Sequence, residues 1–342
     1  MKIHVLTSDG SPLGVTMNTV MGNDPAQLGV GGAELGILTL CDLWRKLGHE
    51  VVLYNNPRLP TGSDFEQLAI SSFNPGEDRD ILIVFRTPYP KISLCKGKKI
   101  WLSTDQYTSR PFHGYNALVD NVVCISDFHA KYFLDTYGIK DTNIIPLPLR
   151  VSDFSPIRTK KVPNRFIFTS VPDRGLANLW RLWGKILQEI PDASLVITSD
   201  YRLWGASSSL DSQHRIKWTF HDNVIYHGAL HRMGMIDELL KAQVMLYPCN
   251  YDELQCLAVG EAQLAWVYPI TTFKGALATT NFGLKIAVDA NDPRNDRLFI
   301  DATLETLNSG NLYHLQEDVR KKVLESSSPE TVLRSWEKLF NG

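Results

Sequence analysis

Residues 251–263 read Tyr-Asp-Glu-Leu-Gln-Cys-Leu-Ala-Val-Gly-Glu-Ala-Gln, shortly after an apolar run, Val-Met-Leu-Tyr-Pro, at 244–248. The run is typical of a buried strand, and the following segment is predicted to be helical. Glu253 and Glu261 lie eight positions apart, so one helix would bring both to nearly the same face. Open α/β sheets bind ligands where a strand leads into a helix, beside amides that favour phosphate. A nucleotide-sugar fits this pattern, and a solvated helix with two surface glutamates is the alternative.

The segments around this stretch alternate apolar strands with amphipathic helices, which indicates parallel pairing. The first half has predicted strands at 3–6, 51–54, 80–85, 99–102 and 121–125 and helices at 33–47 and 126–133. The second half has strands at 165–169, 194–198, 224–227, 244–248 and 268–272 and helices at 176–190 and 235–241. The predicted fold class is therefore α/β, with two Rossmann-like, doubly wound parallel sheets that face each other across a cleft.

The 342 residues suit two domains of about 150 residues each. The segment 150–164, rich in proline and charge, is the best linker candidate. We expect an amino-terminal domain over 1–155 and a carboxyl-terminal domain over 156–328, with a last helix in 329–342 that can pack back on the first domain.

Composition excludes several classes of function. The chain is 44% hydrophobic and 21% charged with a net charge of −2, so it has no basic footprint and nucleic acid is not an expected partner. No apolar stretch reaches the roughly 20 residues of a membrane span. Five cysteines without a Cys-x-x-Cys pair suggest a reducing, cytoplasmic location and argue against structural zinc.

A glycine-rich turn, Gly29-Val30-Gly31-Gly32-Ala33-Glu34, precedes the first long predicted helix. Gly31 and Gly32 would let the backbone approach a phosphate or sugar closely, beside the helix dipole. Plain turn chemistry is the alternative, and the pattern is not the dinucleotide fingerprint.

Three further residues lie at or after the ends of predicted strands. Arg174 could pair with a diphosphate, or it could be a surface residue of a turn. Asp105 could orient a sugar hydroxyl or accept a proton, although an aspartate in a loop is more often a turn former. His227 could face a nucleotide base or have a structural role.

With these motifs in order, the chain resembles the retaining GT-B glycosyltransferases of the family-four type. The strongest likeness is the stretch 252–280, which is similar to that family's donor-binding Glu-seven residues-Glu segment with its next strand and glycine turn. Gly31-Gly32-Ala33-Glu34 resembles the family's amino-terminal Gly-Gly-x-Glu. The resemblance extends over essentially the whole chain.

The resemblance implies roles for individual residues. Glu253 would contact the donor sugar, Glu261 the ribose, and the amides around Cys256 and Leu257 the pyrophosphate. Gly31 and Gly32 would line the phosphate and acceptor side, and Arg174 would serve as the basic clamp. The chain departs from the pattern where Cys256 and Trp266 replace common glycines, Thr279 a common glutamate and Thr104 a histidine, and where the clamp's upstream arginine is absent.

The implied activity is metal-independent transfer of a sugar, with retention, from a nucleotide diphosphate-sugar to an acceptor hydroxyl. A UDP- or GDP-sugar is the expected donor, no further cofactor is expected, and the acceptor is a glycan, a lipid-linked sugar or another hydroxyl compound. Three alternatives remain: an epimerase or phosphorylase on the same fold, a non-catalytic nucleotide-sugar-binding protein, and sugar transfer to modified DNA bases.

Overall fold

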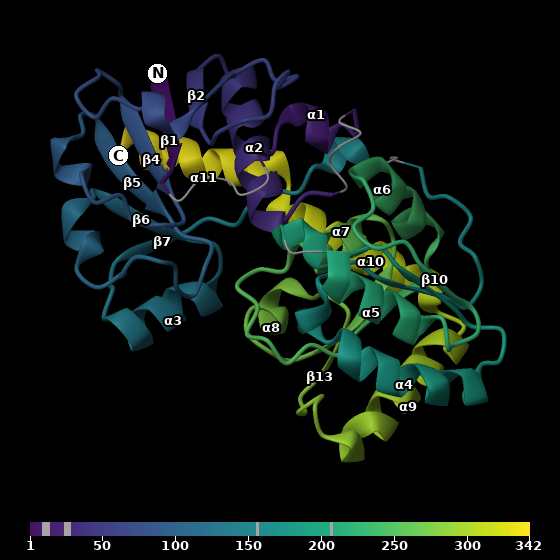
Figure 1. Cartoon of the computed structure of the whole chain (residues 1–342). Helices are drawn as coiled ribbons and strands as arrows, with labels where there is room; N and C mark the ends of the chain where they lie inside the picture. The colour runs from purple at the N-terminus through teal and green to yellow at the C-terminus, as the bar shows by residue number, and fades with distance from the viewer. Residues whose placement is uncertain (9–13, 24–28, 155–156, 206–207) are drawn as a thin grey trace. The chain divides into compact units, whose positions relative to one another are not determined.

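The computed structural model describes residues 1–8, 14–23, 29–154, 157–205 and 208–342. Its contacts divide the chain into two compact units, each built on one parallel sheet with helices (Figure 1). The first unit comprises Met1–Asn23, Gly32–Pro148 and Pro329–Gly342, and the second includes Leu149–Ser328 together with Gly29–Gly31. The predicted α/β class with two doubly wound parallel sheets is confirmed. The predicted domain boundary at 155–156 lies outside the described residues.

The first unit contains a seven-stranded parallel sheet in the order β3-β2-β1-β4-β5-β6-β7. Its strands are β1 (Lys2–Thr7), β2 (Glu50–Tyr54), β3 (Glu66–Leu68), β4 (Ile81–Phe85), β5 (Lys98–Leu102), β6 (Asn121–Cys124) and β7 (Thr142–Ile144). Its helices are α1 (Met17–Val20), α2 (Gly32–Lys46), α3 (Asp127–Tyr137) and α11 (Pro329–Asn341). The chain adds β2 and β3 on one side of β1 and then returns to place β4 on its other side. The strand order therefore reverses between β1 and β4.

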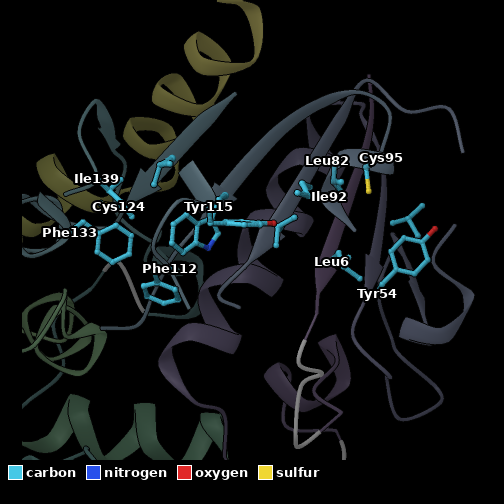
Figure 2. Packing of buried hydrophobic residues seen from close by; sticks show 14 residues of the cluster. Leu6, Tyr54, Leu82, Ile92, Cys95, Phe112, Tyr115, Cys124, Phe133 and Ile139 are labelled. Carbon is cyan, nitrogen blue, oxygen red and sulfur yellow. The ribbon is translucent and has the colours of Figure 1, made fainter. Parts of the chain in front are cut away.

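Central strands of this sheet are buried on both faces, as in other parallel sheets covered by helices. All five residues of β4 are buried, so the strand is one continuous apolar run. One face carries the core cluster of Figure 2, in which Trp101 of β5 packs edge-on against Phe112 at 4.9 Å and Tyr115 at 5.2 Å. Alternate residues of β4 and β6, the strands on either side of β5, supply the same face, among them Leu82 and Cys124.

The last helix, α11, belongs to the first unit, where the yellow ribbon of Figure 1 lies beside the strands. Its buried face presents Val332, Trp336 and Phe340. Trp336 meets Trp44 of α2 edge-on at a centroid distance of 5.2 Å. An aromatic pair of this geometry contributes about 0.5–1.5 kcal/mol beyond the area it buries, so the helix is a fixed part of this core.

The second unit contains a six-stranded parallel sheet in the order β10-β9-β8-β11-β12-β13. Its strands are β8 (Arg165–Phe168), β9 (Ser194–Ile197), β10 (Val224–Tyr226), β11 (Val244–Tyr247), β12 (Tyr268–Thr272) and β13 (Leu284–Ile286). Its helices are α4 (Leu176–Glu189), α5 (Ser208–Trp218), α6 (Arg232–Lys241), α7 (Leu257–Leu264), α8 (Leu277–Thr280), α9 (Asp296–Asn308) and α10 (Leu312–Ser327). Here the strand order reverses between β8 and β11.

One prediction about this unit is wrong. Glu253 and Glu261 do not share a helix, because α7 begins at Leu257 and Glu253 lies in the loop before it. The Glu253 carbonyl accepts a hydrogen bond from the Ala276 amide at 2.6 Å, and its own amide donates to the Tyr251 carbonyl at 2.9 Å. Cys256 then adopts the left-handed conformation, with φ 65° and ψ 74°, immediately before the helix. A right-handed helix cannot continue through such a residue, so the two carboxylates are oriented by different elements.

Candidate active site

The carboxyl edge of the second sheet carries an ion pair where the strand order reverses. Arg174 follows β8 in the short 3-10 turn Pro172–Arg174, and Glu253 follows β11. The Arg174 Nε lies 3.3 Å from Glu253 Oε1, and the two side chains are 18% and 13% exposed. Because parallel strands end at one edge, the turns after β8 and β11 meet where open α/β sheets bind their ligands.

Two aromatic side chains also contact the Arg174 guanidinium. Its central carbon lies 3.5 Å from the ring centroid of Tyr251 and 5.5 Å from that of Trp204. Stacking of this kind stabilises a cation by about 0.5–2 kcal/mol and restricts where it can move. Arg174 is therefore a cation held in place at the carboxyl edge of the second sheet. Its aromatic contacts do not depend on which anion it pairs with.

The Glu253 carboxylate has a second partner, the hydroxyl of Tyr247. The buried Tyr247 hydroxyl lies 2.8 Å from Glu253 Oε1 and 3.1 Å from Ser170 Oγ. Burial raises the pKa of Glu253 above its ordinary value of 4.5, while Arg174 and the Tyr247 hydroxyl lower it. The carboxylate is thus poorly hydrated and fixed by one ion pair and one hydrogen bond, which suits a group that orients a ligand.

Two glycines make this close arrangement possible. A Cβ on Gly175, which has φ 101°, would lie 2.5 Å from the Pro248 carbonyl oxygen. A Cβ on Gly275, which has φ 55°, would lie 2.5 Å from the amide nitrogen of Glu253. Only glycine combines these backbone angles with such contacts, so Gly175 is needed for the β8 turn to pack on the β11 turn.

The amino terminus of α7 lies four residues beyond Glu253 in the chain. Cys256 is the residue before the helix and Leu257 its first residue. Burial raises the pKa of the Cys256 thiol well above 9.0, and the nearby Glu253 raises it further, so the thiol is neutral at neutral pH. The amides at this helix start are the donors that the sequence predicted for a pyrophosphate. Their contact with a pyrophosphate stays a prediction.

Glu261 is oriented by a separate buried network. Its Oε1 accepts a hydrogen bond from Arg232 Nη1 at 2.8 Å, and the side chain is 7% exposed. Arg232 Nε donates in turn to Asp153 Oδ2 at 2.6 Å, and Arg150 Nε lies 3.1 Å from the same oxygen. Neither Arg232 nor Asp153 was among the predicted residues. The sequence shows that these residues are charged, but it does not show that the segments containing Asp153, Arg232 and Glu261 meet in the fold.

His227, Gly31 and Gly32 occupy simpler surroundings. His227 follows β10 with an exposed side chain, and its backbone amide donates to the Ile197 carbonyl at 2.9 Å. Gly31 precedes α2, whose first residue is the exposed Gly32. The predicted contacts of these three residues with a nucleotide or phosphate stay predictions.

Asp105 belongs to a second ionic cluster, at the carboxyl edge of the first unit's sheet. Its Oδ2 lies 2.8 Å from Arg86 Nε and 3.0 Å from Thr104 Oγ1. Arg86 Nη1 also donates to Glu34 Oε1 of α2 at 2.6 Å. Arg86, directly after β4, has φ 63°, an uncommon conformation for a bulky residue that is found disproportionately at functional sites. Arg86 was not among the predicted residues, although its position directly after a buried strand was a usable signal.

Comparisons with known proteins agree with this architecture. No family model matches the chain. It is 22% identical over 234 residues to the uncharacterized glycosyltransferase YqgM of Bacillus subtilis, over 65% of this chain and 62% of that protein's length. The aligned part thus spans less than two thirds of that relative.

Solved structures of glycosyltransferases share the fold. A glycosyltransferase from Rickettsia africae has a TM-score of 0.75 at 15% identity, over 99% of this chain and 97% of its own. HepE from Anabaena, solved with UDP and glucose, has a TM-score of 0.72 at 12% identity, with both chains fully covered. Sucrose-phosphate synthase from Thermosynechococcus elongatus has a TM-score of 0.71 at 14% identity, over 100% of this chain and 98% of its own. The chain therefore has the GT-B fold of these glycosyltransferases.

Within residues 1–8, 14–23, 29–154, 157–205 and 208–342, no group of three or more His, Cys, Asp or Glu side chains could hold a metal ion. The same part of the chain has no helix that is both long enough and apolar enough to cross a membrane.

Proposed function

We propose that the chain is a glycosyltransferase that moves a sugar from a nucleotide diphosphate-sugar to an acceptor hydroxyl, with retention and without a metal ion. The observation that carries the proposal is the Arg174–Glu253 pair where the strand order of the second sheet reverses. A positioned cation beside a positioned carboxylate matches a donor that carries an anionic diphosphate next to a ring of hydroxyls.

In this mechanism Arg174 and the amides at the start of α7 stabilise the charge that builds on the departing diphosphate. Glu253 accepts hydrogen bonds from sugar hydroxyls and sets the ring's orientation. Before donor binding the two side chains neutralise each other at 3.3 Å. The diphosphate then takes over part of Arg174's pairing, and the Tyr251 stack keeps the guanidinium in place during that exchange.

In this proposal the first unit binds the acceptor. Asp105, held by Arg86 and Thr104, orients an acceptor hydroxyl rather than moving freely as a proton carrier, because both of its oxygens already accept hydrogen bonds. Glu34 is fixed by the same arginine. Proposed acceptors are glycans, lipid-linked sugars and other hydroxyl compounds.

UDP-sugars are the first donors to test, since HepE was solved with UDP and glucose and also with UDP-glucose. GDP- and ADP-sugars complete the panel. A donor at 100 times its Kd adds about 2.7 kcal/mol to the stability of the folded state, which a thermal melt detects readily. Failure of every nucleotide-sugar to raise the melting temperature would contradict the proposal.

Product analysis then separates the proposal from its alternatives. The stabilising donor is incubated with and without an acceptor panel in EDTA, and products are identified by mass spectrometry and their anomeric configuration by NMR. A glycosylated acceptor of retained configuration supports the proposal. An altered sugar nucleotide without acceptor indicates an epimerase, a sugar phosphate formed only with inorganic phosphate indicates a phosphorylase, and binding without turnover indicates a non-catalytic binding protein.

A further inference from the structure

A pocket of about 840 Å³ lies in the first unit, beside the starts of β5 and β6 and along the edge strand β7. Its walls come from the start of β5, the start of β6, the end of β7 and the last turn of α11. This volume falls in the range of small-molecule sites in proteins, about 300–1,000 Å³. No predicted functional residue lines it.

The pocket is lined by more positive than negative charge. The side chains of Lys98, Lys99 and Lys338 line it, against one acidic side chain, that of Asp120. The Asp120 Oδ2 already accepts a hydrogen bond from the backbone amide of Lys99 at 2.6 Å. Among the residues that the structure describes, no carboxylate oxygen lies within 4.0 Å of the Nζ atom of these three lysines. Their charge is therefore available to an anion.

One of the three lysines is positioned by the backbone. Lys98 Nζ donates to the Leu339 carbonyl of α11 at 2.6 Å, which joins the two walls of the pocket and leaves two of its three donors for a ligand. The remaining wall has polar groups of Asn121, Asn143 and Ser335 and the 44% exposed side chain of Ile144. Such a wall, with polar groups and one apolar side chain, can contact the organic part of an anion that is larger than a simple inorganic ion.

We propose that this pocket binds a phosphate ester. A phosphate group offers three strong acceptor oxygens to several ammonium donors, and the pocket has room for the alcohol to which it is joined. The ester is either a soluble metabolite or the head group of an anionic lipid, and both present the same chemistry to Lys98, Lys99 and Lys338.

The pocket is distinct from the predicted site at the other edge of the same sheet. Lys98 begins β5, and Asp105 follows the end of that strand at Leu102. Four residue steps of about 3.3 Å place the two ends of β5 roughly 13 Å apart. A ligand in the pocket thus contacts neither Asp105 nor Arg86, and its binding is separable from any activity of the proposed active site.

The test uses two matched double variants of the full chain. In Lys99→Gln with Lys338→Gln, two lysines of the pocket lose their charge, and Lys98 is kept because it holds α11. In Lys46→Gln with Lys131→Gln, two exposed lysines of the same unit lose theirs, so the net charge changes equally. Glycerol 3-phosphate and inorganic phosphate are titrated calorimetrically at low salt, and vesicles of phosphatidylcholine with and without phosphatidylglycerol are used in flotation.

Binding that weakens at least tenfold in the Lys99/Lys338 variant but not in the Lys46/Lys131 variant supports the proposal. A loss confined to the soluble phosphates identifies a metabolite, and a loss confined to phosphatidylglycerol vesicles identifies a lipid head group. An Arg174→Gln variant must keep this binding, since Arg174 could attract phosphate elsewhere. The proposal is overturned if neither probe binds, if both double variants weaken binding equally, or if Arg174→Gln alone abolishes it.

Discussion

Replacing Glu253 by glutamine tests the proposed active site most directly, because it removes one charge and keeps the shape. At 3.3 Å and an effective dielectric constant of about 20, the attraction between Arg174 and Glu253 is about 5 kcal/mol. Desolvation of the carboxylate opposes this attraction, and burial is the largest influence on its pKa, which is raised overall. The ionised carboxylate is therefore less favourable in the folded than in the unfolded chain.

We expect Glu253→Gln to change the free energy of unfolding at neutral pH by less than about 1 kcal/mol, in either direction. The amide can still accept from the Tyr247 hydroxyl, and Arg174 keeps its stack on Tyr251. Activity should fall about 10²–10³-fold in kcat/KM, the effect of losing an interaction of about 2.7–4 kcal/mol in the transition state. Urea unfolding and turnover of the donor that passes the thermal screen measure the two quantities.

The pH dependence of stability gives a second, independent readout. A carboxyl group whose pKa is raised in the folded state makes its full contribution to stability below its unfolded pKa, ordinarily 4.5. That contribution is lost as the pH rises through the folded pKa, because unfolding then releases a proton. The stability of the parent relative to Glu253→Gln should therefore decrease above pH 4.5 and then level off.

A matched control exists in the same unit. Glu238 pairs with Arg165 at the amino edge of the sheet, and its side chain is 12% exposed, close to the 13% of Glu253. Glu238→Gln should keep turnover within about threefold of the parent, since it alters a comparable pair far from the proposed chemistry. Near-parental turnover of Glu253→Gln, or an equal loss of activity in Glu238→Gln, would refute the reasoning.

The remaining predictions concern residues in the left-handed conformation. Cys256→Gly should raise the free energy of unfolding by up to about 1 kcal/mol, because glycine adopts φ 65° without strain and its entropic cost is small. Trp266→Gly, at φ 55°, should instead lower the free energy of unfolding by about 3–5 kcal/mol, because the buried Trp266 ring packs under Arg320 at 3.8 Å. Gly175→Ala should lower the free energy of unfolding by at least about 2 kcal/mol and weaken donor binding. Gly48→Ala, at φ 88° with open space around its Cβ, should lower the free energy of unfolding by about 1 kcal/mol and leave donor binding unchanged. Urea unfolding and donor-induced thermal shifts measure both pairs, and equal effects within either pair would contradict this account.

Much of the fold was predictable because buried parallel strands are continuous apolar runs. Strands such as β4 and β11 contain only buried residues, and their hydrophobicity identifies them without reference to their neighbours. The strands β3, β7 and β13 were not predicted. Each is three residues long and lies at the edge of its sheet, where partial exposure removes the apolar signal.

The candidate site was predictable only in part. Arg174 and Glu253 could be placed at strand ends from the order of elements, and the structure brings their side chains together. Tyr247 and Tyr251 could not be identified, since an aromatic residue at the end of a strand usually belongs to the core. The single-helix assumption failed because a residue spacing says nothing about the left-handed turn at Cys256 that interrupts the segment.

The two carboxylates thus differ in what holds them, and this difference bears on their proposed roles. Glu253 faces Arg174, which is stacked on Tyr251 and is 18% exposed, so its pairing can be exchanged for a ligand. Glu261 faces Arg232, whose side chain is 3% exposed and bridges to Asp153, so this pairing is not easily exchanged. If Glu261 binds a ribose, it must do so while its Oε1 remains bonded to Arg232. Arg232 would then set the carboxylate's orientation, and Asp153 and Arg150, just after the second unit begins at Leu149, would fix Arg232.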